Sequence, residues 1–346
     1  MINGNATHYF ILLGLWVLLT GVWQYTRKQK GPAFQLPERR EIGPIPVLLG
    51  PFDYLKALLS WVFLFGKIGF VQPGLYYIGE RDESAPLLVT CNNFLTLFLL
   101  VRRIGKRASR LLVIDTAGVN VWCSAGKGKF SAEEILRVGD HFDLFSSEKK
   151  EKLVLPKFSL SGVRLQTLKD RNISPIIGPL YAKDLPYYLD EKKYRNCTED
   201  VVNFGIQART FTALPTAIQF LYYVLALYVV SLGHFPVEGI GLVTVYAFLY
   251  PVLFSWLPFR WFVHKALVMG LLSVPVLFLL SSAWEFVAWT SFSFATLIFI
   301  ALSYTGNSAV SNYTEVRKET ARFLPVSILL YLLAFVVALS VKWSWV

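Results

Sequence analysis

The chain alternates between long apolar runs and one polar region. Residues 9–25 form an apolar run of roughly the length that crosses a bilayer, about 17–25 residues. Five more apolar runs follow residue 214, at approximately 215–232, 239–257, 265–282, 286–303 and 324–341. The stretch from about 80 to 210 carries most of the acidic and basic residues. This pattern predicts a polar domain embedded in a membrane protein.

Within the polar region, short apolar runs bounded by turn residues alternate with helix-like stretches. Strands are expected at 75–78, 87–90, 111–115, 153–155 and 175–177, and helices at 94–104, 132–138, 161–168 and 182–189. Strands and helices that alternate at this spacing are typical of a mostly parallel sheet. The predicted fold class is therefore an α/β Rossmann-like domain plus an α-helical transmembrane bundle of one N-terminal and five C-terminal spans.

The pattern divides the chain into four parts. Residues 1–26 are predicted to be an N-terminal transmembrane anchor with its N-terminus outside, because basic residues follow the apolar run and none precedes it. Residues 27–70 are a linker rich in Pro and Gly, with an interfacial or domain-covering helix at 57–65. Residues 71–212 form the cytoplasmic domain, and residues 213–346 form the five-span transmembrane domain.

Composition supports a membrane location. Apolar residues make up 54% of the 346 residues and charged residues only 16%, which is too apolar for a chain of soluble domains. The net charge of +11 comes from bases that stand beside the apolar runs, which favours membrane lipid and topology over nucleic acid. Short loops with Arg260, Lys265 and Arg317 then fall on the cytoplasmic side. We expect a multi-pass protein of the cytoplasmic (inner) membrane with its polar domain facing the cytoplasm.

The candidate chemistry lies in residues 111–135, where a strand and a turn precede a segment rich in Gly and Lys. A phosphate loop is excluded, because Val121 stands where its first Gly belongs and Gly128 where a Ser or Thr must hold magnesium. Cys123 follows the strand, and a helix N-terminus together with Lys127 and Lys129 would favour its thiolate. Cys123 is thus a candidate nucleophile or soft metal ligand, and a purely structural role stays open. A dyad with His141, the one histidine of the polar domain, also stays open.

The segment Asn120-Val121-Trp122-Cys123-Ser124-Ala125-Gly126-Lys127-Gly128 resembles the cap-helix signature of the corrinoid protein of microbial mercury methylation, the HgcA family. That family is related to the corrinoid domain of the corrinoid iron-sulfur protein large subunit. Further landmarks occur in the same order at 73–76, 87–90, 153–156, 177–179, 256–258 and 304–306. The resemblance covers about residues 70–341. The chain departs from the family at Ser124, where alanine is usual, and in its N-terminal anchor.

The resemblance implies a membrane-anchored, corrinoid-dependent methyltransferase that passes the methyl group of methyl-Co(III) to Hg(II) and forms methylmercury. It implies a cobalamin-type corrinoid as cofactor, with Cys123 as the catalytic residue and the axial ligand to cobalt. A soft thiolate suits that position. The cofactor-binding residues implied by the matched motifs are Thr90, Asn120, Val121, Trp122, Cys123, Ser124, Ala125, Gly126, Lys127, Gly128, Pro156, Gly178 and Pro179.

The resemblance also implies partners from anaerobic one-carbon metabolism. Cys91, Cys123 and Cys197 are the only three cysteines, too few for an iron–sulfur cluster of the chain's own. Electrons are therefore expected from a ferredoxin-like 4Fe-4S donor, and the methyl group from a methylated folate. Two alternatives stay open: a corrinoid methyl carrier for a different acceptor, and a non-enzymatic membrane protein, a transporter or scaffold, with a Rossmann-like domain.

Overall fold

The computed structural model describes residues 50–62, 70–145, 150–191, 202–230, 236–305, 308 and 313–342. The anchor predicted at 1–26, most of the linker and Cys197 lie outside these residues. The chain divides between Val202 and Asn203 into two compact units, a helical unit and an α/β unit.

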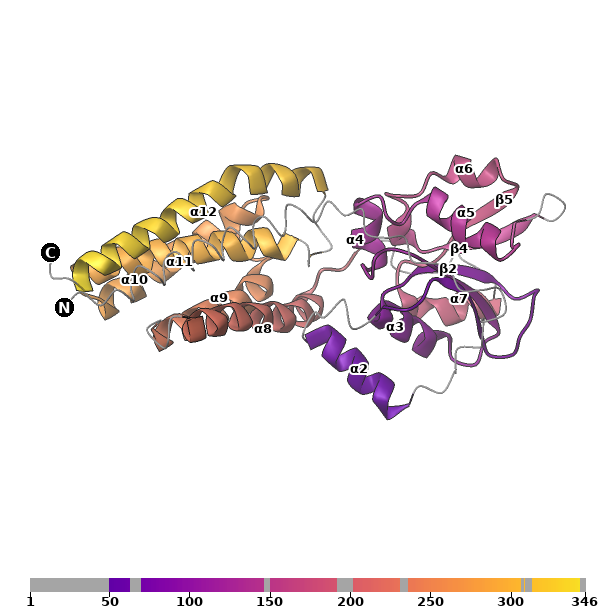
Figure 1. Cartoon of the computed structure of the whole chain (residues 1–346), viewed down its shortest axis with the longest axis horizontal. Helices are drawn as coiled ribbons and strands as arrows, with labels where there is room; N and C mark the ends of the chain where they lie inside the picture. Colours follow the sequence, from indigo (N-terminus) through magenta and orange to yellow (C-terminus); the bar gives the residue numbers. More distant parts are fainter. Residues whose placement is uncertain are drawn as a thin grey trace. The chain divides into compact units, whose positions relative to one another are not determined.

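The helical unit contains five long helices among the residues that the structure describes (Figure 1). They are α8 (Ile206–Val230), α9 (Val237–Leu253), α10 (Phe262–Leu280), α11 (Ala283–Tyr304) and α12 (Tyr313–Lys342). Four of them are long and apolar enough to cross a membrane, whereas α9 is a shorter apolar helix of 17 residues. These four helices indicate a membrane protein and agree in outline with the predicted C-terminal bundle. The predicted count of five spans is not confirmed, because α9 is too short to be counted among them.

Buried charged side chains bind backbone groups at the connection between α9 and α10. Arg209 donates to the carbonyl of Val252 at 2.6 Å, and the ammonium group of Lys265 donates to the carbonyls of Phe254 and Leu257 at 2.8 and 2.6 Å. The Glu319 carboxylate accepts from the first amides of α10 at 3.2 and 3.0 Å. Helix ends leave such groups without intrahelical partners. These charges therefore satisfy backbone groups at the connection, a structural role that the sequence alone did not indicate.

The α/β unit is built on a five-stranded sheet in the order β1-β3-β2-β4-β5. Its strands are β1 (Gly74–Ile78), β2 (Leu87–Cys91), β3 (Ser109–Ile114), β4 (Glu151–Leu155) and β5 (Ile173–Ile177). β1 pairs antiparallel with β3, and the other pairings are parallel. The five predicted strands are therefore present, and the prediction of a mostly parallel sheet is confirmed.

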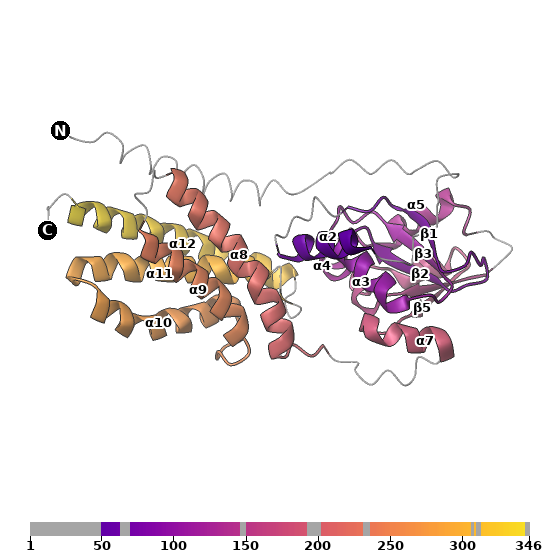
Figure 2. The same cartoon turned by 90° about the horizontal axis from the view of Figure 1, so that it is seen from below.

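Helices cover both faces of the sheet (Figure 1, Figure 2). α3 (Phe94–Ile104) and α7 (Leu185–Glu191) pack with one apolar cluster, which includes Leu88 and Val113. α5 (Ala132–His141) and α6 (Leu165–Lys169) pack with a second cluster, which includes Leu87 and Leu112. Side chains alternate between faces along a strand, so a strand buried on both sides reads as a continuous apolar run.

Two predicted helices differ from the structure. The first, expected at 161–168, forms only at α6, because the turn before it includes Gly162, which lies directly against α4 (Val121–Gly126). A Cβ added to Gly162 would stand 2.5 Å from the carbonyl oxygen of Phe130 and 2.8 Å from the Cα of Ala125. The second, expected at 182–189, is divided into a 3-10 turn at Ala182–Asp184 and α7.

An ion pair is buried at the amino ends of two strands of the sheet. Arg110, on β3, donates to the Glu151 carboxylate, on β4, at 2.7 Å, and to the carbonyl of Ala85 at 2.9 Å. Less than a tenth of either side chain is exposed. β2 lies between β3 and β4, so the pair joins strands that are not neighbours.

We expect Glu151→Ala to destabilise the α/β unit by about 3–5 kcal/mol, because the Arg110 guanidinium would stay buried without its counter-charge. Asp140→Ala breaks an exposed ion pair with Arg171 and serves as the matched control, with an expected cost of about 0–1 kcal/mol. Pulse proteolysis in urea, applied to the detergent-solubilised full chain, measures both. Equal urea midpoints for the two variants would contradict the structural role of the buried pair.

Candidate functional site

One buried amide side chain holds the loop that leads into the predicted site. The Asn92 side chain, just after β2, is fully buried. Its oxygen accepts hydrogen bonds from the Thr116 amide and hydroxyl, both at 2.9 Å, and from the Gly118 amide at 3.0 Å. Its nitrogen donates to the Asp115 carboxylate at 3.1 Å. Asn92 therefore joins the carboxyl end of β2 to the loop that follows β3.

The short helix α4 follows this loop and carries Cys123. Asn120 is its N-cap, with the side-chain oxygen accepting from the Cys123 amide at 2.9 Å. α4 ends at Gly126, and Gly128 beyond it has a φ of +69°, a conformation that suits glycine. The sequence analysis placed Cys123 before a helix that carries Lys127. That placement is wrong, because the Asn120 cap begins the helix earlier, so that Cys123 lies in its first turn and Lys127 follows its end.

Ser124, the departure from the family signature, points into its own helix. The side chain is fully buried, and its hydroxyl donates to the carbonyls of Asn120 at 2.7 Å and Val121 at 2.9 Å. Its backbone carbonyl accepts from the amides of Lys127, Lys129 and Phe130. The Ser124 hydroxyl is therefore hydrogen-bonded within α4. The α4 backbone, and not the cavity, accommodates the serine that replaces the usual alanine.

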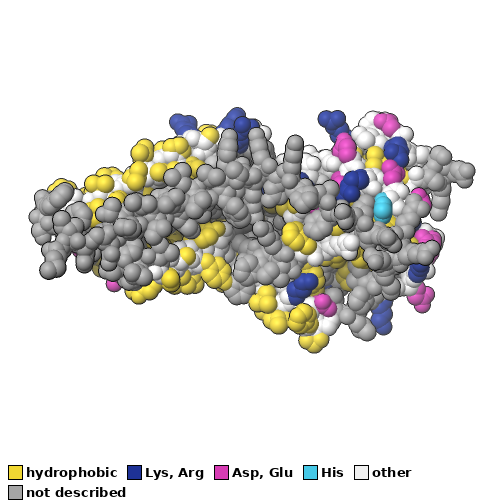
Figure 3. Space-filling view, in the orientation of Figure 1, with side chains coloured by type: hydrophobic (Ala, Val, Ile, Leu, Met, Phe, Trp, Pro, Cys, Tyr) yellow, Lys and Arg dark blue, Asp and Glu magenta, His cyan; other side chains and the backbone are white. Residues whose placement is uncertain are grey.

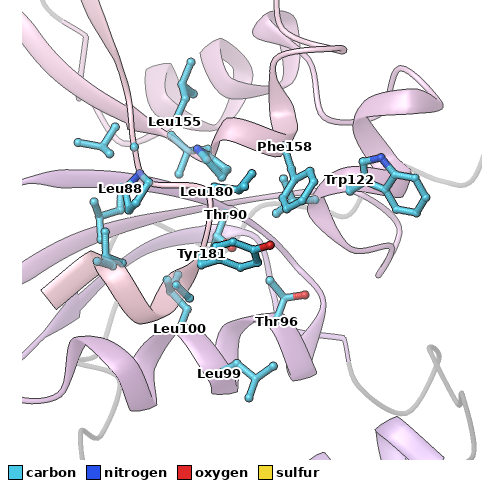
Figure 4. Close-up of a pocket in the computed structure, with 18 of the residues that line it drawn as sticks. Leu88, Thr90, Thr96, Leu99, Leu100, Trp122, Leu155, Phe158, Leu180 and Tyr181 are labelled. Carbon is cyan, nitrogen blue, oxygen red and sulfur yellow. The ribbon is translucent and has the colours of Figure 1, made fainter. Parts of the chain in front are cut away.

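A cavity of about 330 Å³ lies at the carboxyl ends of β2, β4 and β5. It is bounded by the start of α4, by α3 and by the segment that leads into α7 (Figure 4). In doubly wound sheets, ligands bind outside the carboxyl ends of the strands where the strand order reverses. Here the order reverses between β2 and β4, which places the cavity at that position. Its wall is mostly apolar, as small-molecule sites usually are.

The predicted cofactor-binding residues fall into two groups. Seven contribute to the cavity wall, namely Thr90, Asn120, Val121, Trp122, Pro156, Gly178 and Pro179. The other six are Cys123, Ser124, Ala125, Gly126, Lys127 and Gly128, which lie in or just after α4 and are not part of the wall. Cys123 directly follows the wall residue Trp122 in the first turn of α4.

Several wall residues were not predicted from the sequence. Phe158 and Tyr181 extend over the cavity from the segments that follow β4 and β5, and Thr96 and Leu100 reach it from α3 (Figure 4). A signal for the first two was present, because residues just beyond the carboxyl ends of parallel strands meet at one edge of the sheet. The α3 residues carried no such signal, since their pattern is that of an ordinary buried helix face.

Burial dominates the electrostatics of Cys123. Desolvation raises the pKa of the half-buried thiol, and the Lys127 ammonium group and the Asn120 side chain only partly oppose this rise. Lys127 thus favours the thiolate, as expected, but burial outweighs its effect in the protein without a ligand. Burial also raises the pKa of Cys91, the last residue of β2, which lies in the apolar core. Among the described residues, no group of three His, Cys, Asp or Glu side chains is arranged to hold a metal ion.

Comparisons with known proteins cover the α/β unit. Residues 69–172 match the family described as CO dehydrogenase/acetyl-CoA synthase delta subunit. The acetyl-CoA decarbonylase/synthase complex subunit gamma of Methanopyrus kandleri is 32% identical over 124 residues, which are 35% of this chain and 27% of that protein. Subunit gamma 2 of Methanosarcina thermophila is 27% identical over 127 residues, which are 35% of this chain and 26% of that protein. The chain thus spans about a quarter of the length of these relatives. The similarities indicate a corrinoid-binding domain family for the matched segment.

We expect Asn92→Ala to loosen residues 115–120, because the buried Thr116 and Gly118 amides would lose their acceptor, at about 1–3 kcal/mol for each group. Hydrogen exchange measured by mass spectrometry should show faster exchange in this loop and at the start of α4. Gln166→Ala, at an exposed position of α6, is the control and should leave exchange there unchanged. Unaltered exchange in the Asn92 variant would show that the loop is held by other contacts.

The pH dependence of Cys123 alkylation tests its electrostatics in the protein without cofactor. Because only the thiolate reacts and the pKa is raised, the rate should still climb above the pH at which an ordinary cysteine reaches half its maximum, about 8.5. Lys127→Gln should lower the rate at neutral pH about twofold, as expected for one exposed charge. Lys129→Gln is the matched control. Mass spectrometry of the Cys123 peptide measures the rate, and a midpoint below 8.5 would contradict the dominance of burial.

Proposed function

We propose that this protein is a membrane-anchored, corrinoid-dependent methyltransferase whose α/β unit holds the corrinoid and whose methyl acceptor is Hg(II). The observation that carries the proposal is the Asn-Val-Trp-Cys run at the start of α4, which stands beside the cavity at the carboxyl edge of the parallel sheet. The similarity of residues 69–172 to subunits of acetyl-CoA synthase complexes supports the corrinoid part. The mercury part rests on the resemblance of the α4 segment to the mercury-methylation family.

The residues at the site suit a corrinoid. Their donor set offers one soft sulfur atom, that of Cys123, beside an apolar wall at the edge of the sheet where ligands of this fold bind. The cavity of about 330 Å³ would accommodate one part of so large a cofactor, with the rest lying over the start of α4. Thr90, Trp122 and Pro156 would hold it, and Cys123 would contact cobalt. When bound, the corrinoid supplies the methyl group and the metal chemistry of its transfer.

The chain's own residues prepare the thiol for this role. Asn120 fixes the first turn of α4 through the Cys123 amide, and the buried Ser124 hydroxyl ties the next turn to the carbonyls behind it. The raised pKa keeps the thiol protonated at neutral pH until a metal displaces the proton. A sulfur held in one place by its helix is a more effective ligand than a mobile one, because less conformational freedom is lost on binding.

A corrinoid methyl carrier for another acceptor is the second candidate. It is favoured by the similarity to acetyl-CoA decarbonylase/synthase gamma subunits, whose names do not refer to mercury. In both candidates we propose a ferredoxin-like 4Fe-4S protein as electron donor, a methylated folate as methyl source, and an inner-membrane location with the α/β unit facing the cytoplasm.

Expression of the full chain with a ferredoxin-like partner, in an anaerobic host that makes no methylmercury, separates the candidates. The proposal predicts a visible corrinoid spectrum in the purified protein and methylmercury when Hg(II) is supplied. Corrinoid loading without methylmercury would reject the mercury assignment and leave the methyl carrier. A protein that takes up no corrinoid, even after reconstitution under reducing conditions, would favour the non-enzymatic alternative.

Cysteine variants test the proposed ligand. Cys123→Ala should abolish methyl transfer and shift the corrinoid spectrum, because sulfur coordination is lost. Cys91→Ala is the control, since Cys91 is a core residue that does not contribute to the cavity wall, and Cys197→Ala is a second control. Both should retain activity. Equal loss in all three variants would indicate a folding defect instead of lost coordination.

A further inference from the structure

The helix α2 (Pro51–Val62) has its polar and apolar sides reversed relative to an ordinary surface helix. Surface helices of soluble domains bury an apolar stripe and expose polar residues. In α2, the exposed side chains include Phe52, Leu55, Leu58 and Leu59, with 77%, 50%, 49% and 41% of their surface open. Residues three and four apart lie on the same side of a helix, so these leucines form one continuous face. In Figure 3, hydrophobic side chains gather at the place where Figure 1 shows α2.

The other side of α2 and its edges pack on the α/β unit through small, polar and aromatic residues. Ala57 is buried, and the Ser60 hydroxyl is buried without a hydrogen-bond partner among the described residues. Tyr54 packs edge-on against Phe98 of α3, with ring centroids 5.1 Å apart. The ammonium group of Lys56 lies 4.2 Å from the centre of the Phe94 ring. These contacts fix the rotation of α2, so its leucine face is directed outward by packing and is not free to turn inward.

Basic residues border the exposed leucine face. Arg102 lies over the ring of Tyr54 at 5.7 Å, and Arg102, Arg103 and Lys106 are all exposed at the end of α3. α3 contains no acidic residue, and Asp53, the acid of α2, bonds the Gly50 amide at 3.0 Å. A leucine face next to exposed bases is complementary to a bilayer surface, whose hydrocarbon boundary accepts apolar side chains and whose anionic headgroups attract bases.

We propose that α2 is an in-plane membrane helix that holds the α/β unit against a bilayer surface carrying anionic lipid. The chain itself supplies the reason that a bilayer is present, since four of its helices are long and apolar enough to cross one. α2 lies in the interface through Leu55, Leu58 and Leu59, while Arg102 and Arg103 contact lipid phosphates. The inference is independent of the proposed methyl transfer, and it adds a second attachment of the protein to the membrane.

Photocrosslinking of the full chain in lipid nanodiscs tests this placement. Leu58→p-benzoylphenylalanine puts the probe on the exposed face, and Gln166→p-benzoylphenylalanine, on α6 across the sheet, is the matched control. After illumination, mass spectrometry should find lipid on the position-58 peptide and only background on the position-166 peptide. Equal lipid yield at both positions, a crosslink to a second copy of the chain, or a crosslink within the same chain would each overturn the proposal.

Two variants then separate the apolar and electrostatic contributions. Adding Leu55→Glu and Leu59→Glu to the position-58 probe should reduce lipid crosslinking to the level of position 166. Arg102→Gln with Arg103→Gln should instead lower the preference for phosphatidylglycerol over phosphatidylcholine nanodiscs by roughly fivefold for each charge removed. All of these side chains are exposed, so an unchanged proteolysis pattern should confirm that the α/β unit stays folded. Unchanged lipid crosslinking in both variants would contradict the lipid-facing role of α2.

Discussion

The hydrogen bonds of the Asn92 side chain are the constraint on which the candidate site depends. β2 lies in the middle of the sheet, and Asn92 directly follows its last residue. Its buried amide joins that strand to the loop after β3, and this loop ends at Asn120, which begins α4 and holds the Cys123 amide. The side chains of two asparagines, Asn92 and Asn120, thus connect the backbone of Cys123 to the centre of the sheet.

Two cysteines show how surroundings decide the role of a thiol. Burial raises the pKa of both Cys91 and Cys123, but Cys91 is fully buried among core residues, whereas Cys123 is only half-buried and has Lys127 near it. A partly exposed thiol can exchange its proton for a soft metal ion. The enclosed thiol has no space for a ligand, and it serves as a small apolar side chain.

Charge is used differently in the two units. In the α/β unit, Arg110 and Glu151 pair with each other between strands. In the helical unit, Lys265 and Glu319 bind backbone groups where α9 ends and α10 begins. Unpaired backbone groups are costly away from water, so charged side chains at a helix connection make it compatible with an apolar environment. The outward leucine face of α2 shows the converse, an apolar surface that suits lipid.

Much of the fold follows from local sequence. The strands are apolar runs between turn residues, and α3 has the bounds predicted for it, with Asn93 and Gly105 as its caps. The family resemblance of the sequence also predicted seven residues that line the cavity, because their order is distinctive. The start of α4 was predicted too late in the chain, because the helix was assigned from the Gly and Lys residues and not from the N-cap Asn120. Only the tertiary structure brought Phe158, Tyr181 and Leu100 to one cavity, raised the Cys123 pKa by burial and turned the leucines of α2 outward. Those features depend on which elements pack together, and residues distant in sequence determine that packing.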